Sequence, residues 1–70
     1  MKITKNSAGL SVGVVVVLPS EETLIIRAVC REPDGIYYRV QFGEFDGDDF
    51  VPTSDIRVMG HYELIGAEIE

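Results

Sequence analysis

The chain is poor in cysteine and histidine and lacks tryptophan. Its 70 residues contain one cysteine, Cys30, and one histidine, His61. A single cysteine excludes an internal disulfide and a cysteine-based zinc cluster. A lone histidine provides neither metal-ligand spacing nor, without a serine motif, a catalytic base. We therefore expect no metal or other cofactor and a fold suited to the reducing cytoplasm.

Basic residues are also scarce. Six Lys and Arg stand against twelve Asp and Glu, which gives a formal net charge of -6. Such a charge opposes binding to a phosphate backbone, so we do not expect direct nucleic-acid binding. A basic peptide or protein surface is the favoured partner, because long-range attraction raises association rates.

Long hydrophobic segments are absent, since no run approaches the ~20 apolar residues of a transmembrane helix. The longest apolar run, residues 12–18, follows Lys2 and Lys5, so the start of a secretory signal is an alternative interpretation. The run is rich in valine, and no small-x-small cleavage site follows it. We therefore expect it to belong to the folded chain, with no membrane association.

The short length limits what the fold can contain. A chain of this size forms one domain, residues 1–70, and buries only about 60% of the surface that its unfolded form exposes. It leaves no room for a deep catalytic cavity. Any function should lie on a surface, in a shallow groove or at an oligomer interface, and enzyme activity is not expected.

Valine and alternating apolar residues predict strands. Residues 12–18 include four consecutive valines, and β-branched side chains disfavour a helix. Both faces of this segment are apolar, so a terminal segment or another subunit should cover the second face. Residues 36–42, "IYYRVQF", alternate between apolar and polar positions and predict a half-buried strand.

The segment "TLIIRAVCRE", residues 23–32, fits a strand or a helix with Ser20 as its cap. The following "PDG" suits a three-residue hairpin loop and favours the strand. The resulting register has these core-facing pairs: Cys30 with Tyr38, Ala28 with Val40, and Ile26 with Phe42. It leaves Arg27, Val29 and Arg31 outside, and Cys30 behaves as a small hydrophobe. A two-residue loop would instead place Arg27 and Arg31 on the face of Phe42 and Tyr38.

The second half of the chain predicts shorter elements. Residues 49–52, "DFVP", predict a short strand that Pro52 ends. The segment "PTSDI" predicts a single helical turn capped by Thr53 or Ser54. "IRVM" predicts another short strand. "HYELIGAEIE" predicts a last extended piece that Gly66 can bend, with His61 as an ordinary polar strand residue.

Five short strands in this order, with a helical turn between the fourth and fifth, resemble a Src-homology-3-like barrel of the Tudor type. The resemblance covers roughly residues 11–59 and is carried by "SVGVVVVL", "DGIYYRVQF" and "DGDDFVPTSDIR". It implies an all-β, five-stranded barrel with a short helical turn before the last barrel strand. Extra extended segments would lie at both termini. Such motifs are evidence for a fold more than for a function.

Tudor domains that read methylated lysine or arginine use an aromatic cage between the loops after the first and third strands. The resemblance places Phe45 near one cage position and Asp46, Asp48 or Asp49 near the polar position. The other loop, "PSEET", contains no aromatic residue, and Tyr37 lies beside the "PDG" turn at the opposite end. The cage is therefore incomplete, and a methyl-lysine reader is not favoured.

The same topology predicts an acidic rim, because the first and third loops of an up-and-down barrel share one end. The candidate partner-binding residues are Glu21, Glu22, Glu44, Phe45, Asp46, Asp48, Asp49 and Phe50. "FDGDDF" is not a calcium loop, since Val51 and Arg57 occupy the positions that require glycine and glutamate. The rim is either a solvated end of the domain or a surface for a cationic partner.

Two classes of function follow. The first is a non-enzymatic binding or adaptor module that docks a basic partner through the acidic end. A more specific form is a DNA-mimic inhibitor of a phage or mobile element, whose carboxylates imitate phosphates. The second is a homo-oligomeric small-barrel enzyme or ligand-binding protein with its site at the subunit interface. Self-association would use the first strand or the terminal segments.

Overall fold

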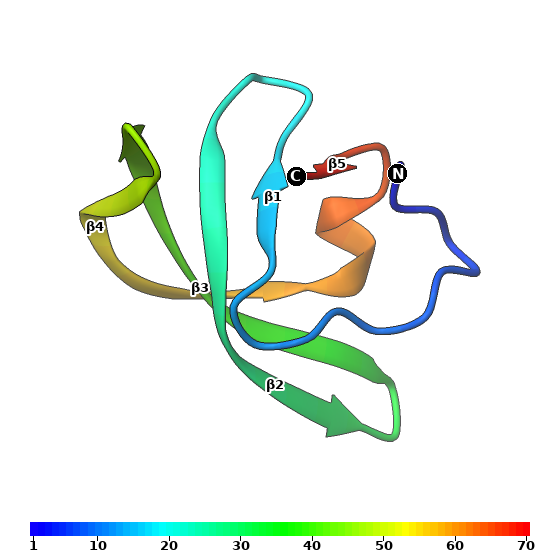
Figure 1. Cartoon of the computed structure of the whole chain (residues 1–70). Helices are drawn as coiled ribbons and strands as arrows, with labels where there is room; N and C mark the ends of the chain where they lie inside the picture. Colours follow the sequence, from blue (N-terminus) through cyan, green and yellow to red (C-terminus); the bar gives the residue numbers. More distant parts are fainter.

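The computed structural model describes residues 1–70 and consists of strands with one short 3₁₀ helix (Figure 1). The elements are β1 (Val15–Val17), β2 (Thr23–Glu32), β3 (Gly35–Asp46), β4 (Asp49–Gly60), the 3₁₀ helix η1 (His61–Leu64) and β5 (Glu68–Ile69). The strands form one antiparallel sheet in the order β4-β3-β2-β1-β5, which confirms the prediction of an all-β fold. Because β4 and β5 are the two edges and the sheet is not closed, the structure does not show a complete barrel.

The second predicted segment, residues 23–32, is a strand and not a helix, and it pairs with β3 in a long hairpin. The predicted three-residue loop is wrong, because Glu32 pairs with Gly35 and leaves only Pro33 and Asp34 in the turn. Cys30 therefore pairs with Tyr37 and is exposed, whereas the sequence placed it in the core opposite Tyr38.

A bulge in β2 explains why the hairpin keeps its apolar face despite the shorter loop. The register shifts between Ile26 and Ala28, so Arg27 is an extra residue on that strand. The observed pairs are Leu24 with Phe42, Ile26 with Val40, Ala28 with Arg39, and Val29 with Tyr38. An extra residue reverses the alternation of side chains beyond it. Leu24 and Ile26 thus face the core before the bulge, and Val29 packs against the core after it.

The predicted helical turn at residues 52–56 is absent, and β4 is one continuous strand through this segment. Gln41 pairs with Ile56 and Gly43 with Pro52, so three residues of β4 lie opposite Phe42 alone. Ser54 compensates for the irregular pairing: its Oγ accepts the Phe42 N–H at 3.1 Å, and its carbonyl accepts the Gln41 side-chain amide at 3.0 Å. The serine that predicts a helix cap therefore stabilises a bulge.

The last ten residues are not one extended piece. Residues 61–64 form η1, where the Glu63 carboxylate accepts the Gly60 N–H at 2.8 Å. The chain then turns through Gly66, whose φ of 93° favours glycine. Glu68 and Ile69 form β5 beside β1. The fifth strand of the sheet thus lies in a segment that the resemblance left outside the barrel.

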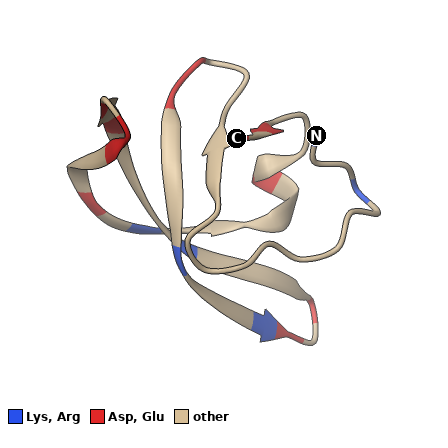
Figure 2. Cartoon of the chain, viewed as in Figure 1, with Lys and Arg blue, Asp and Glu red and all other residues tan.

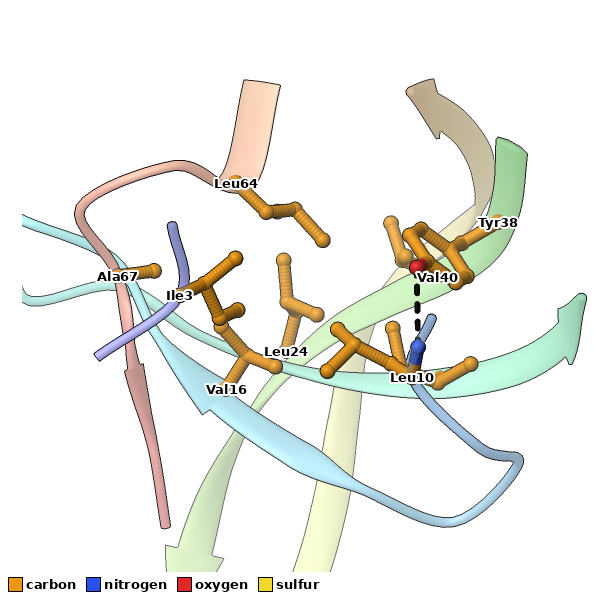
Figure 3. Packing of buried hydrophobic residues seen from close by; sticks show 9 residues of the cluster. Ile3, Leu10, Val16, Leu24, Tyr38, Val40, Leu64 and Ala67 are labelled. Carbon is orange, nitrogen blue, oxygen red and sulfur yellow. Dashed lines mark hydrogen bonds between the residues drawn. The ribbon is translucent and has the colours of Figure 1, made fainter. Parts of the chain in front are cut away.

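The core combines the sheet with both chain ends. Nine hydrophobic residues are buried: Ile3, Leu10, Val16, Leu24, Ile26, Tyr38, Val40, Leu64 and Ala67. Figure 3 labels all of them except Ile26. Residues 1–10, which we call the N-terminal strap, contribute Ile3 and Leu10. The strap is held to the C-terminal segment by hydrogen bonds from Ile3 N to Ala67 O and from Gly66 N to Ile3 O, each 2.8 Å long.

The strap also covers the core beside Tyr38, which has no exposed surface. The Tyr38 hydroxyl accepts the Leu10 N–H at 3.0 Å and lies 2.9 Å from Nδ1 of His61. Nε2 of His61 lies 3.3 Å from the Thr4 carbonyl, which can only accept, so in the neutral imidazole Nε2 donates to Thr4 and Nδ1 accepts from Tyr38. His61 is therefore a structural link between the strap and the sheet, not an ordinary strand residue.

The first strand is shorter than predicted and is an interior strand of the sheet. Only Val15–Val17 form β1, which lies between β2 and β5. Val16 is fully buried, and Val14 and Leu18 pack against the core. Val15 and Val17 alternate with Val16 and face the other side of the sheet, where they are half-buried.

Candidate partner-binding surface

The structure brings the two predicted acidic loops to the same end of the molecule. Acidic residues follow β1 in one loop and surround the turn between β3 and β4 in the other (Figure 2). Glu21, Glu22, Glu44 and Phe45 line one shallow hollow of about 350 Å³. Thr23, Phe42, Gly43 and Thr53 complete its lining. We call this concavity the acidic hollow.

The loop between β1 and β2 holds its two glutamates in a tight backbone turn. The Glu21 N–H donates to the Leu18 carbonyl, and the Leu18 N–H donates to the Glu22 carbonyl, both at 2.8 Å. Glu21 has a φ of 74°, which is the left-handed region that residues with a side chain rarely adopt. The Ser20 hydroxyl donates to the Glu22 carboxylate at 3.1 Å. This loop therefore presents two carboxylates from a well-defined backbone.

The other wall of the acidic hollow comes from the β3–β4 hairpin. Most of the predicted acidic loop is strand, because β3 reaches Asp46 and β4 begins at Asp49. Only Gly47 and Asp48 form the turn. Gly47 has a φ of 64°, as the first central residue of a type II′ turn requires. Asp46, Asp48 and Asp49 thus cluster at the hairpin tip and do not line the hollow.

Two phenylalanines stiffen this hairpin. Phe45 pairs with Phe50 across the strands, with ring centroids 5.7 Å apart and planes at 87°. The Phe50 ring also lies against Gly43, where a Cβ atom would come within 2.6 Å of the ring and 2.4 Å of the Val51 carbonyl. Phe50 therefore packs within the hairpin and does not line the acidic hollow. Phe45 is 45% exposed and is one of the lining residues.

The carboxylates of this end have no basic partner within the chain. The one ion pair of the structure joins the N-terminal amino group to Glu68 at 3.6 Å, and neither residue lines the acidic hollow. Arg57 lies 5.5 Å from the ring centroid of Phe42, one of the lining residues, but it forms no ion pair with the carboxylates. The acidic end is thus a patch of uncompensated negative charge.

Sequence reasoning missed Phe42, Thr23 and Thr53 as residues of this surface. Phe42 was assigned to the core face, and it does pack against the core while also lining the hollow. Thr53 was assigned to a helical turn, but the bulge of β4 brings it beside the glutamates. The alternation of β3 could have identified Phe42 as the last core residue before the strand leaves the core.

The arginines of the central hairpin lie apart from the acidic hollow. Arg27 donates two hydrogen bonds to Oε1 of Gln41, at 2.9 and 3.1 Å. Arg39 lines a second hollow of about 460 Å³, together with Ala28, Cys30, Glu32, Asp34, Tyr37, Tyr38 and Val58. This outer hollow is larger than the acidic one, but its charges are of both signs and it gathers no concentrated positive patch.

Two side chains near the outer hollow have altered acidity. The hydrogen bond from the Cys30 thiol to the Glu32 carboxylate, 3.2 Å long, raises the thiol pKa, and the negative charge of Glu32 adds to the effect. In the same way, the hydrogen bond from the Tyr37 hydroxyl to Asp34, 2.9 Å long, raises the pKa of Tyr37. A thiol held in its protonated form is a weaker nucleophile.

No three His, Cys, Asp or Glu side chains lie together in a way that could hold a metal ion. None of the helical segments has the length and hydrophobicity that a membrane crossing requires.

No family model, curated protein or solved structure matches this chain.

Proposed function

We propose that this protein is a small, non-enzymatic binding module of the Src-homology-3-like, Tudor-like class that docks a basic peptide or protein surface at its acidic end. The observation that carries the proposal is the acidic hollow itself. Two glutamates from the β1–β2 loop and one from β3 line it together with two phenylalanine rings.

The fold assignment has support from the strand order. Strands β1 to β4 form an antiparallel meander, and β5 follows the helical turn η1 and pairs with β1. The resemblance also has a helical turn before the last strand, although it placed that turn at residues 52–56. The sheet order leaves β4 and β5 apart, so the assignment to a closed barrel is part of the proposal. The exposed, unpaired Cys30 agrees with a reducing compartment, and we place the protein in the cytoplasm.

The chemistry of the hollow suits a cationic side chain. A lysine or arginine that entered it would meet unpaired carboxylates, and the exposed part of Phe45 would contact its aliphatic stem or its charged head. The tip residues Asp46, Asp48 and Asp49 would act at longer range and raise the association rate. The lining contains only two aromatic rings, which favours an unmethylated cation over a methylated one.

A fluorescein-labelled oligo-arginine peptide tests the proposal by anisotropy at low and high salt. Replacing Glu21, Glu22 and Glu44 together by glutamine should raise the dissociation constant by about tenfold, because each exposed charge pair contributes up to about 1 kcal/mol. Replacing Asp46, Asp48 and Asp49 by asparagine should chiefly slow association and flatten the salt dependence.

The matched control changes the same number of charges elsewhere: Glu32→Gln, Asp34→Asn and Glu70→Gln. These residues are exposed and do not line the acidic hollow. An equal loss of affinity in the control and in the glutamate triple would mean that net charge alone attracts the peptide. That result would contradict a site at the acidic end.

The DNA-mimic hypothesis is a more specific form of the same proposal. It is supported by the uncompensated carboxylates on both loops. In a pull-down from native lysate, excess duplex DNA should then displace the captured protein. Capture that duplex DNA does not affect would contradict the DNA-mimic form while leaving the general binding module intact.

A further inference from the structure

Three places in the chain carry the groups for a spontaneous rearrangement of the backbone. An aspartate or asparagine that precedes a small residue can react with its own backbone, because the next amide nitrogen approaches the side-chain carbonyl carbon with little hindrance. The chain contains two Asp–Gly pairs, Asp34–Gly35 and Asp46–Gly47, and one Asn–Ser pair, Asn6–Ser7. Every other aspartate precedes a residue with a larger side chain. The structure places the three pairs in different environments.

At Asp46–Gly47 both reacting groups are free. Asp46 is the exposed last residue of β3, and its carboxylate has no hydrogen bond and no ion pair. Gly47 lies in the turn outside the strands, and its nitrogen donates no backbone hydrogen bond. A Cβ atom at Gly47 would meet nothing within 4 Å, so the space around the tip is open. The carboxyl and the nitrogen can therefore approach each other without losing a contact.

At Asp34–Gly35 the carboxyl is held in place. Its Oδ2 accepts the Tyr37 hydroxyl at 2.9 Å, and both residues line the outer hollow. Closing a ring onto the Gly35 nitrogen turns the carboxyl away from Tyr37 and breaks this hydrogen bond. The two Asp–Gly pairs are identical in sequence, but the reaction at Asp34 has to overcome an additional interaction.

At Asn6–Ser7 the nitrogen is occupied instead. The Ser7 N–H donates to the Thr4 carbonyl at 3.1 Å, and the Thr4 N–H donates to the Ser7 Oγ at 2.8 Å. This turn has to open before the Ser7 nitrogen can attack the Asn6 side chain. Two of the three pairs are thus protected by a hydrogen bond, one at its carboxyl and one at its nitrogen, and Asp46–Gly47 is not.

We infer that Asp46–Gly47 is a self-modification site, at which the folded chain converts aspartate to isoaspartate without an enzyme or a cofactor. First, the Gly47 nitrogen attacks the side-chain carbon of the protonated Asp46 carboxyl. A C–N bond forms and a C–O bond breaks, and the carboxyl hydroxyl leaves as water with the amide proton. Second, a water molecule attacks the backbone carbonyl of the resulting succinimide and breaks its bond to nitrogen. The water lost in the first reaction is regained in the second.

The product keeps the mass and the charge of the chain but changes the hairpin tip. Its backbone now runs through the former side chain of Asp46 and is longer by an extra carbon, and the free carboxylate is attached to Cα. Asp46 pairs with Asp49, and the next pair is Phe45 with Phe50, whose ring centroids are 5.7 Å apart. The additional carbon therefore disturbs the pairing closest to the turn. This inference does not depend on the proposed function.

The test compares the reaction in the folded chain with that in the same chain unfolded in guanidinium chloride. Both samples are incubated at physiological temperature and digested, and electron-transfer fragmentation then distinguishes isoaspartate from aspartate at each residue. Asp46 should react in the folded chain at a rate within about threefold of its unfolded rate, because an open loop tip has little local stability. Asp34 and Asn6 should each be slowed by more than about threefold, because a hydrogen bond has to break first.

Tyr37→Phe is the deciding variant, because it removes the hydrogen bond to Asp34 and leaves the hairpin tip unchanged. It should raise the folded-state rate at Asp34 to within about threefold of the unfolded rate and have no effect at Asp46. Asp46→Glu keeps the charge and the glycine turn but would need a larger ring, so isomerisation at this position should disappear. The inference would be overturned if folding slowed the reaction at Asp46 by more than about threefold, or as much as at Asp34. An unchanged rate at Asp34 in Tyr37→Phe would also overturn it.

Discussion

The two ends of β3 serve different purposes in this molecule. At the Tyr38 end, the hydroxyl bonds to the strap and to His61, and no buried side-chain polar atom lacks a partner. At the Phe45 end, the strand continues into a free hairpin whose carboxylates have no basic partner. One strand thus links a closed, structural end to an open, charged end. The difference indicates where stability resides and where a partner can bind without competing against internal contacts.

The closed end should give the largest stability effect. Tyr38→Phe removes the hydroxyl, which leaves the buried Leu10 N–H and Nδ1 of His61 without their partner. We expect a loss of about 2 kcal/mol in the free energy of unfolding, because an unsatisfied buried polar group costs about 1–3 kcal/mol. Urea unfolding followed by circular dichroism measures the change.

The neighbouring tyrosine provides the matched control. Tyr37→Phe removes the same atom, but that hydroxyl bonds to Asp34 at the exposed turn. Its loss should change the unfolding free energy by less than about 0.5 kcal/mol. Equal losses in the two variants would show that the strap does not depend on the Tyr38 hydroxyl, and the contrast between the two ends would lose its basis.

The open end should yield a gain in stability when one of its acids is removed. Glu21 occupies the left-handed region, at a cost of about 1 kcal/mol for a residue with a Cβ atom. Glu21→Gly should therefore raise the free energy of unfolding by somewhat less than this amount, because glycine also gains freedom in the unfolded chain. The same variant should bind the oligo-arginine peptide more weakly. Urea unfolding and anisotropy on one preparation test both effects.

Glu22→Gly is the companion variant, since Glu22 is not in the left-handed region. It should lose affinity without any gain in stability. If Glu21→Gly lowered the free energy of unfolding as much as Glu22→Gly does, the left-handed backbone at Glu21 would not destabilise the folded chain.

Local sequence patterns predicted the strands better than their register. The alternation of residues 36–42 correctly identified β3, and the valine run identified β1, because both depend on side-chain periodicity. The loop at "PDG" was predicted one residue too long. Its true length depends on the bulge at Arg27, which is set by packing on both strands and has no local signal. The register therefore could not follow from the turn residues alone.

The same limit applies to the elements around β4. Ser54 and Thr53 are common helix caps, and in an isolated segment they favour a turn. Here Ser54 bonds to Phe42 and Asp55, so tertiary pairing determines which backbone groups it satisfies.

For the candidate site, topology alone indicated that Glu21 and Glu22 would neighbour the β3–β4 hairpin. It could not indicate that Asp46, Asp48 and Asp49 would stand at the tip, because that depends on how far the strands extend.

The smallest predicted effect concerns pH at the β2–β3 turn. The Cys30 thiol donates to Glu32, so its pKa lies above the ordinary thiol value of about 8.5. The bond needs the protonated thiol, so its contribution to stability is complete below that ordinary pKa and disappears as the pH rises through the raised one. Tyr37 and Asp34 behave alike at higher pH, because the hydrogen bond to Asp34 raises the pKa of Tyr37. The turn should therefore loosen in alkali.

Alkylation of Cys30 by iodoacetamide as a function of pH measures this effect directly, since the thiolate is the reacting form. Glu32→Gln removes the negative charge that holds the proton, so the rate profile should move to lower pH. Glu63→Gln is the control, because it removes the same charge from a residue that bonds to the Gly60 N–H and not to the thiol. Superimposable profiles for wild type and Glu32→Gln would mean that the carboxylate does not control the thiol. The turn would then be a freely solvated loop like the hairpin tip at Asp48, and the two ends of β3 would be less different than the structure indicates.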